Sequence, residues 1–281
     1  MKKLIVVTGP TASGKTDLAV RLALEHDTEI ISADSRQIFK GIPIVTAVPD
    51  ESQRAGVTHH LMEMLPLEAY YSAAKFEEDA LRIAHDIWHR RDVAIVCGGS
   101  MMYVDALTNG IDELPTVPDG IRQPLMEKWT ENGDDWLRDR LKALDKEYYS
   151  VVDLANMKRV FHAVEICMAS GTTYSSLRTG KRKKRDFEIE KIVIDLPREQ
   201  LFDRINRRVL SMVERGLEDE ARKVYPLRHL NSLNTVGLKE MFAFFDGEMD
   251  FDTAIARIQK NTRVYAKKQM TWLKKQCGQS S

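Results

Sequence analysis

Residues 9–16 read Gly9-Pro10-Thr11-Ala12-Ser13-Gly14-Lys15-Thr16 and match the phosphate-binding pattern G-x-x-x-x-G-K-[ST] at every position. The glycines allow the loop to curl so that its amide N–H groups point at phosphate oxygens, and the helix that follows adds the positive end of its dipole. Lys15 supplies a point charge, and the hydroxyl of Thr16 is placed to bind Mg²⁺. We therefore predict a phosphate site here, with Thr16 as the metal ligand.

The flanking sequence has the strand–loop–helix context that this pattern requires. Apolar, β-branched runs at 4–8, 29–33 and 93–97 predict buried parallel strands, and apolar spacing predicts helices after the loop and over 76–87. Alternating strands and helices indicate a doubly wound sheet, whose ligands bind at the carboxyl ends of the strands. We predict an α/β fold: a parallel sheet core like that of P-loop NTPases, with a helical insertion domain.

The insertion interrupts the sheet domain in the middle of the chain. After residue 114 the sequence favours helices, until the run 191–195 resumes the strand pattern. We therefore predict a P-loop α/β core domain formed by residues 1–114 and 191–281, and a helical insertion domain over 115–190. The last predicted helix covers approximately 252–276.

Charge is balanced overall but segregated along the chain. Lys+Arg and Asp+Glu are 42 each, which excludes a global polycation, and the 43% of apolar residues excludes wholesale disorder. Residues 112–153 hold 11 acidic and 6 basic side chains, 154–215 hold 14 basic and 8 acidic, and 257–275 hold seven Lys/Arg and no acid. The second half is locally basic, so a nucleic-acid partner is not excluded.

The sequence does not favour disulfide bonds, a signal peptide or a membrane span. Cys97, Cys167 and Cys277 are odd in number and form no C-x-x-C, which argues against a disulfide framework or a cysteine zinc site. The apolar run at 4–7 is too short for the core of a signal peptide, and no stretch approaches the roughly 18 apolar residues of a membrane span. We expect a soluble, cytoplasmic protein with reduced thiols and no membrane partner.

Strand ends supply the candidate catalytic carboxylates. The D-x-x-G and N-K-x-D motifs of a nucleotide switch are missing, and the strand at 93–97 ends in two glycines rather than in the aspartate of an ATPase, leaving only Asp195 for that role. Asp34 ends the second strand, near the phosphate loop. It is equally consistent with a functional carboxylate and with an Asx turn or helix cap, and Ser35 also fits a cap.

Seven segments between residues 4 and 274 resemble, in order, motifs of the tRNA dimethylallyltransferases, which prenylate N6 of adenosine 37 beside the anticodon. They are the phosphate loop, Asp34 to Phe39, Thr46-Ala47, Gly98 to Tyr103, Asn156 to Glu165, Asp195 to Val209, and Thr262 to Trp272. The chain departs from the family at Val45, Val48 and His162, where a glycine, a lysine and an arginine are usual. These departures bear on tRNA contacts rather than on the chemistry.

The resemblance implies transfer of the dimethylallyl group from dimethylallyl diphosphate to adenosine 37 of tRNA, with Mg²⁺ as cofactor. It implies that Asp34 is the general base, that Lys15 and Thr16 act in catalysis, and that the diphosphate lies on residues 9–16 and Arg208. The tRNA-binding positions that it implies are Asp34, Ser35, Arg36, Gln37, Ser100, Arg122, Lys158, Arg159, His162, Arg263 and Lys267. We expect a monomer.

Two basic surfaces are candidates for contact with RNA phosphates. They are a stripe at helical spacing and a run on the insertion, namely Lys260, Arg263, Lys267, Lys274 and residues 181–185. By themselves they fit a solvated helix face and a flexible hairpin tip, whereas the resemblance favours RNA surfaces. Without RNA, Arg122 fits a surface ion pair with Asp119 or Glu127.

The residues leave three other functions open. A P-loop kinase of small metabolites would share the fold and turn over nucleotide without RNA. A non-catalytic RNA-binding paralogue would keep the basic surfaces, although retention of Asp34, Lys15 and Thr16 argues against it. A related enzyme would prenylate free adenine nucleotide, whereas the insertion and the basic surfaces favour tRNA.

Overall fold

The computed structural model describes residues 2–278, with side chains to Lys275. These residues divide into two compact units, one made of 2–109 with 184–278 and the other of Gly110–Lys183. The prediction had placed the boundaries of the insertion at 115 and 190. Within the described residues, no helix is both long and apolar enough to cross a bilayer.

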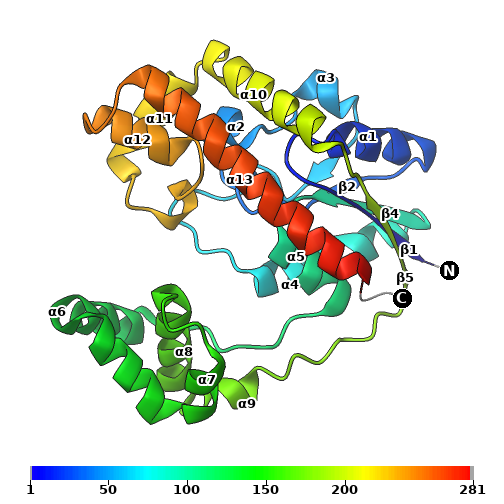
Figure 1. Ribbon diagram of the computed structural model, residues 1–281. Coiled ribbons are helices and arrows are strands. Elements are labelled where there is room, and N and C mark those ends of the chain that lie inside the picture. Colours follow the sequence, from blue (N-terminus) through cyan, green and yellow to red (C-terminus); the bar gives the residue numbers. More distant parts are fainter. Residues whose placement is uncertain (1, 279–281) are drawn as a thin grey trace. The chain divides into compact units, whose positions relative to one another are not determined.

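The larger unit is built on a parallel sheet (Figure 1). Over the described residues it has five strands in the order β3-β2-β4-β1-β5, namely β1 (Lys3–Thr8), β2 (Ile30–Ser32), β3 (His59–His60), β4 (Val93–Gly98) and β5 (Glu188–Val193). In the centre, β1 pairs with β4 from Lys3 opposite Val93, and with β5 from Lys3 opposite Glu188. Its apolar run is buried because both edges and both faces of β1 are covered.

Helices cover both faces of the sheet. The side chains of Ile5 and Val7 pack with Ala19 and Val20 of α1 (Lys15–Glu25). Since side chains alternate along a strand, their neighbours in β1 point to the other face. Further helices of this part are α2 (Pro43–Thr46), α3 (Glu51–Arg54), α4 (Ala73–Trp88) and α5 (Met101–Asn109). The apolar face predicted over 76–87 is the buried face of α4.

The C-terminal part of this unit adds a helical layer. It consists of α10 (Arg198–Glu214), α11 (Leu217–Val224), the 3₁₀ turns η1 (Tyr225–Leu227) and η2 (Asn231–Leu233), α12 (Leu238–Phe245) and α13 (Phe251–Gly278). Leu201 and Ile205 of α10 pack against Ala266 of α13. The long α13, red in Figure 1, runs beside α10 and α12.

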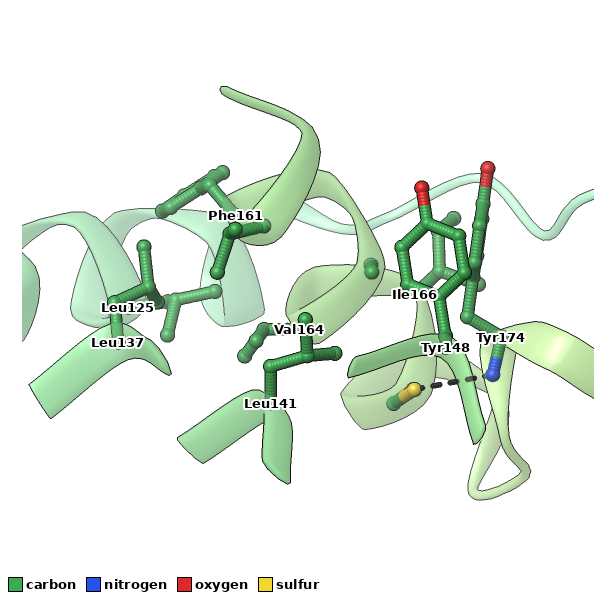
Figure 2. Close-up of a cluster of buried hydrophobic side chains, with 11 residues drawn as sticks. Leu125, Leu137, Leu141, Tyr148, Phe161, Val164, Ile166 and Tyr174 are labelled. Carbon is green, nitrogen blue, oxygen red and sulfur yellow. Dashed lines mark hydrogen bonds between the residues drawn. The ribbon is translucent and has the colours of Figure 1, made fainter. Parts of the chain in front are cut away.

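The second unit is helical, as its sequence predicted. It contains α6 (Asp119–Leu144), which kinks at Gly133, and α7 (Lys146–Val151), α8 (Met157–Ser170) and α9 (Tyr174–Leu177). Figure 2 shows its core, in which Leu137 and Leu141 of α6 pack against Val164 of α8. The carboxylate of Asp145 is buried there and accepts hydrogen bonds from the amides of Tyr148, at 2.9 Å, and Ser175, at 2.7 Å.

The returning strand differs from the prediction. It was expected at 191–195, but β5 spans Glu188–Val193. As an edge strand it carries charges, and Lys3 of β1 pairs with both Glu188 and Glu190. A search for apolar runs misses such charged positions, so it places the strand too late.

Candidate active site

The phosphate loop forms a closed turn between β1 and α1. Gly14 precedes the helix with φ of 89°, a conformation that favours glycine, and Ala12 also has a positive φ of 62°. The Nζ of Lys15 donates to the carbonyl oxygen of Pro10 at 3.1 Å, and burial lowers the pKa of this ammonium group. The predicted Lys15 and Thr16 thus begin α1, where amides and the helix dipole favour an anion.

Two arginines of α10 reach this loop. Arg204 Nη1 donates to the carbonyl oxygen of Ser13 at 3.1 Å, and Arg208 Nη1 donates to Thr11 Oγ1 at 3.4 Å. Burial lowers the pKa of Arg208, with nearby Asp34 acting in the opposite direction. An arginine stays protonated in proteins despite such shifts, so Arg208 is a fixed positive charge beside the loop.

The structure shows the Asx turn that was one of the two interpretations of Asp34. Its Oδ1 accepts hydrogen bonds from the amides of Arg36, at 2.9 Å, and Gln37, at 3.3 Å, as in an Asx turn. It also lines a cavity in the same unit as the phosphate loop. One oxygen therefore holds the turn, which leaves the other for chemistry.

The cavity has a volume of about 370 Å³ and combines polar and apolar walls. Its charged and hydroxyl-bearing lining includes Thr11, Asp34, Ser35, Arg36, Ser100, Arg208 and Tyr265, and its apolar lining includes Val45, Ile205, Val209, Met212, Val236 and Ile258. Burial raises the pKa of Tyr265 to about 12, so its hydroxyl stays protonated at neutral pH and can donate a hydrogen bond. A ligand with an anionic end and an apolar end fits this lining.

The tRNA candidates near Asp34 make internal contacts. Arg36 donates to the carbonyl oxygens of Asn231, Ser232 and Asn234, and burial lowers its pKa. It therefore holds the loop before α12 while still lining the cavity.

Neighbouring positions are similarly engaged. Gln37 Nε2 donates to the carbonyl oxygens of Thr46 and Ala47. Ser100 Oγ accepts from the amide of Ser35 at 2.8 Å and is almost fully buried. These side chains shape the site from within the protein.

Two of the candidates in the second unit lie beside one buried carboxylate. Glu165 of α8 pairs with Arg122, at 3.5 Å between Nη1 and Oε2, and with His162, at 2.9 Å between Nδ1 and Oε1. The ion pair with Asp119 or Glu127, which was the alternative to an RNA contact, is replaced by the pair with Glu165, because packing brings α8 against α6. Lys158 and Arg159, also predicted, are exposed on α8.

The basic run 181–185 is not uniform. Residues 181–184 are exposed, as a phosphate surface requires. Arg185 instead pairs with the buried Glu77 at 2.6 Å and donates to the carbonyl oxygens of Ala106 and Leu107 at the end of α5. Arg185 is thus a structural residue, which corrects its assignment to an RNA surface.

The basic residues of the stripe on α13 also differ in their contacts. Lys260, Lys267 and Lys274 are exposed on α13, and Lys267 lies 5.6 Å from the ring centroid of Phe202. Arg263 donates to Asn206 Oδ1 of α10. Part of its donor capacity is therefore used in packing α13 against α10.

Comparison with known proteins places the chain in a family. The model of the IPP transferase family matches residues 37–276. The chain belongs to this family. Among IPP transferases it is similar to tRNA dimethylallyltransferase 1 of Bacteroides thetaiotaomicron, with 50% identity covering 98% of this chain and 89% of the relative. It is also similar to the tRNA dimethylallyltransferase of Christiangramia forsetii, with 46% identity covering 97% and 90%.

Solved structures of the family agree with the fold. The tRNA isopentenylpyrophosphate transferase of Bacillus halodurans is 32% identical, with a TM-score of 0.68, covering 98% of this chain and 87% of that one. A eukaryotic dimethylallyltransferase described as acting on tRNA is 26% identical, with a TM-score of 0.83, covering 97% and 70%. The prediction of family membership and of a parallel α/β fold is confirmed.

Some side chains of the candidate site were not singled out in the sequence analysis. They are Arg204 of α10, which contacts the phosphate loop, Tyr265 in the cavity and Gln269 on α13. Arg204 lies in the matched segment Asp195 to Val209, and Tyr265 and Gln269 lie in Thr262 to Trp272, so the motifs were a signal for these residues but not for their partners.

Proposed function

We propose that this enzyme transfers the dimethylallyl group of dimethylallyl diphosphate to N6 of adenosine 37 in tRNA. The observation that carries the proposal is the cavity in which Asp34 shares a wall with Thr11 and Arg208. A proton acceptor and an anion site then face the same space, which also has apolar walls. A prenyl diphosphate has the matching anionic and apolar ends.

Different residues act on the leaving group and on the attacking amine. The bond between the allylic carbon and the diphosphate oxygen breaks, and its electron pair leaves with diphosphate. Arg208, Lys15 and the loop amides stabilise the negative charge that develops there. The same carbon bonds to N6, and the N6 proton passes to Asp34, since the amine is a poor nucleophile until that proton is accepted.

Mg²⁺ is part of the proposal. Within the described residues, no group of three or more His, Cys, Asp or Glu is placed to hold a metal. Thr16 at the start of α1 supplies a hydroxyl, and this sparse donor set fits Mg²⁺, which keeps several waters and binds largely through substrate phosphates. When bound, Mg²⁺ would neutralise charge on the leaving diphosphate.

The basic residues are proposed to bind the anticodon stem and loop. The exposed Lys158, Arg159 and residues 181–183 supply charge on the helical unit, and Lys184 with Lys260, Lys267 and Lys274 of α13 supplies it on the larger unit. A single-stranded loop with splayed bases is the form of RNA that proteins read by sequence, and adenosine 37 would have to leave its stack to enter the cavity. We also propose that the chain acts as a monomer.

Incubation with labelled dimethylallyl diphosphate and Mg²⁺ tests the proposal, with tRNA or AMP as acceptor. We expect label in tRNA alone, at adenosine 37 after nuclease digestion and mass spectrometry. Label in AMP alone would favour the free-nucleotide enzyme, and ATP turnover without RNA would favour a kinase. A tRNA lacking adenosine 37 is the matched control and should stay unlabelled.

A further inference from the structure

Gln269 links three segments of the site that are distant in the sequence. It lies on α13, one turn after the cavity residue Tyr265, and its side chain is only 3% exposed. Its Oε1 accepts from the amide of Thr11 at 2.8 Å, and its Nε2 donates to the carbonyl oxygen of Gly99 at 2.8 Å. The phosphate loop and the end of β4 are therefore joined through one side-chain amide.

The orientation of this amide is determined by its partners. The Thr11 amide is a donor, so it requires the oxygen of Gln269, and the Gly99 carbonyl is an acceptor, so it requires the nitrogen. Glycine at 99 makes the contact possible, because a Cβ there would lie 2.5 Å from Nε2 of Gln269. A side chain at 99 would push the amide away from the loop.

The bond to Gln269 affects what the loop offers to a phosphate. The Thr11 amide is already paired, so it is held in place rather than turned toward a ligand. The same residue presents its hydroxyl to Arg208 at 3.4 Å and lines the cavity. Holding the backbone of Thr11 therefore fixes the place where the loop meets Arg208.

We propose that Gln269 is a positioning residue that fixes the Thr11 end of the phosphate loop, and thereby the Arg208 contact, for binding diphosphate. This inference rests on the proposed function, in which the loop binds the diphosphate of the substrate. Gln269 acts through Thr11 and touches no reacting atom. It makes α13 a structural support of the anion site.

Replacing Gln269 by glutamate separates positioning from packing. In the Gln269→Glu variant, a protonated carboxyl group would keep both bonds, since its carbonyl oxygen accepts and its hydroxyl donates. The ionised form would place a negative oxygen against the Gly99 carbonyl and lose that bond. Since burial raises the pKa of a carboxyl group, the protonated form would persist into the mildly acidic range.

The experiment measures binding of inorganic diphosphate with Mg²⁺ by calorimetry at pH 5.5 and 8.5, for wild type, Gln269→Glu and Gln269→Leu. We expect Gln269→Glu to bind about tenfold more weakly than wild type at pH 8.5, as loss of a buried hydrogen bond implies, and to approach wild type at pH 5.5. Gln269→Leu, which can make neither bond, should bind weakly at both pH values. Expressing each affinity relative to wild type at the same pH removes the titration of diphosphate itself.

Gln259→Glu is the matched control on α13, because Gln259 also donates to a backbone carbonyl but lies away from the loop. Its affinity for diphosphate should equal that of wild type at both pH values. Wild-type diphosphate affinity in the neutral Gln269→Leu variant, or an equal deficit of Gln269→Glu at both pH values, would overturn the inference alone. Failure of the wild type to bind diphosphate would overturn the proposed function and the inference together. A thermal melt of each variant confirms that the measured protein is folded.

Discussion

Asp34 uses its carboxylate for structure as well as for the proposed chemistry. Replacement by alanine would remove the hydrogen bonds to the amides of Arg36 and Gln37, so a loss of activity would have two explanations. Asparagine keeps an acceptor oxygen for the turn and removes the base. Asp34→Asn therefore tests the base without removing the turn.

For Asp34→Asn we expect prenyl transfer to fall by about 10²–10⁴-fold, the usual contribution of a general base. Binding of tRNA and of diphosphate should stay within about threefold of wild type, because no phosphate contact is removed. Single-turnover rates with saturating tRNA measure the effect. Near-normal turnover would remove Asp34 from the role of base.

Lys15 is placed at the start of α1 with its Nζ near the loop carbonyl of Pro10. For Lys15→Ala we expect kcat/KM for dimethylallyl diphosphate to fall by about 10²–10³-fold, since a charge aimed at the leaving group is lost. The affinity for tRNA should be unchanged in a filter-binding assay. If tRNA binding collapsed as well, the loop would be an RNA contact or a folding element.

The side chain of Arg122 pairs with Glu165 but stays 42% exposed. The ion pair therefore orients the guanidinium group and leaves it accessible to a ligand. If it contacts RNA, Arg122→Ala should raise the apparent KM for tRNA by about tenfold and leave the KM for dimethylallyl diphosphate unchanged. Asp119→Ala, on the same helix, is the control and should behave as wild type. Equal KM values for tRNA in wild type and Arg122→Ala would reduce Arg122 to an ion-pair partner of Glu165.

At the scale of elements, Asp145 connects the end of α6 to α7 and α9. Burial tends to raise its pKa, but hydrogen bonds from the amides of Tyr148 and Ser175 outweigh this and hold the pKa below its usual range. A lowered carboxyl pKa adds stability above the pKa of the unfolded chain, and this stability is lost as the pH falls through the folded-state pKa. The helical unit should therefore weaken in acid.

For Asp145→Ala we expect a loss of about 2–3 kcal/mol in the free energy of unfolding of this unit at pH 7, because buried amides lose their acceptor. The difference from wild type should shrink as the pH falls below about 4. Urea unfolding followed by the fluorescence of Trp129 and Trp136 in this unit measures it. Asp139→Ala, an exposed site on α6, should change stability by under about 0.5 kcal/mol.

At the scale of the whole molecule, the chain has no net charge, so tRNA binding must depend on where the basic residues lie. Lys181, Arg182 and Lys184 are the exposed residues to neutralise, because Arg185 supports α5 and Lys183 lies near Glu113. Neutralising all three should weaken the binding of every substrate tRNA by the same factor, because phosphate contacts carry no sequence information.

Binding curves at several salt concentrations test this surface. The slope of log K against log salt is negative, and in the variant that combines Lys181→Ala, Arg182→Ala and Lys184→Ala it should become shallower by about two to three units if all three residues contact phosphates. Neutralising Lys128, Arg140 and Lys146, exposed residues of the acidic part of the helical unit, provides a charge-matched control and should leave the slope unchanged. Equal slopes in both triple variants would place the phosphate surface elsewhere.

Much of the fold of this protein could be predicted from local sequence patterns. The phosphate loop between β1 and α1 and the buried face of α4 follow from runs and spacings of neighbouring residues. Buried strands and amphipathic helices leave such signals because each must cover its own apolar side chains. The two-residue β3 left no such signal and was missed, and the charged start of the edge strand β5 led to bounds that lay too late.

Partners of polar side chains were decided only by the tertiary structure. Arg185, read as part of a basic run, supports α5 through Glu77, and Arg122 finds Glu165 rather than an acid on its own helix. Gln269 meets Thr11 across 258 positions of sequence. A hydrogen bond depends on distance and direction between two atoms, and for residues so far apart these are set by packing of the elements that carry them, whereas strand and helix patterns are set by the residues themselves.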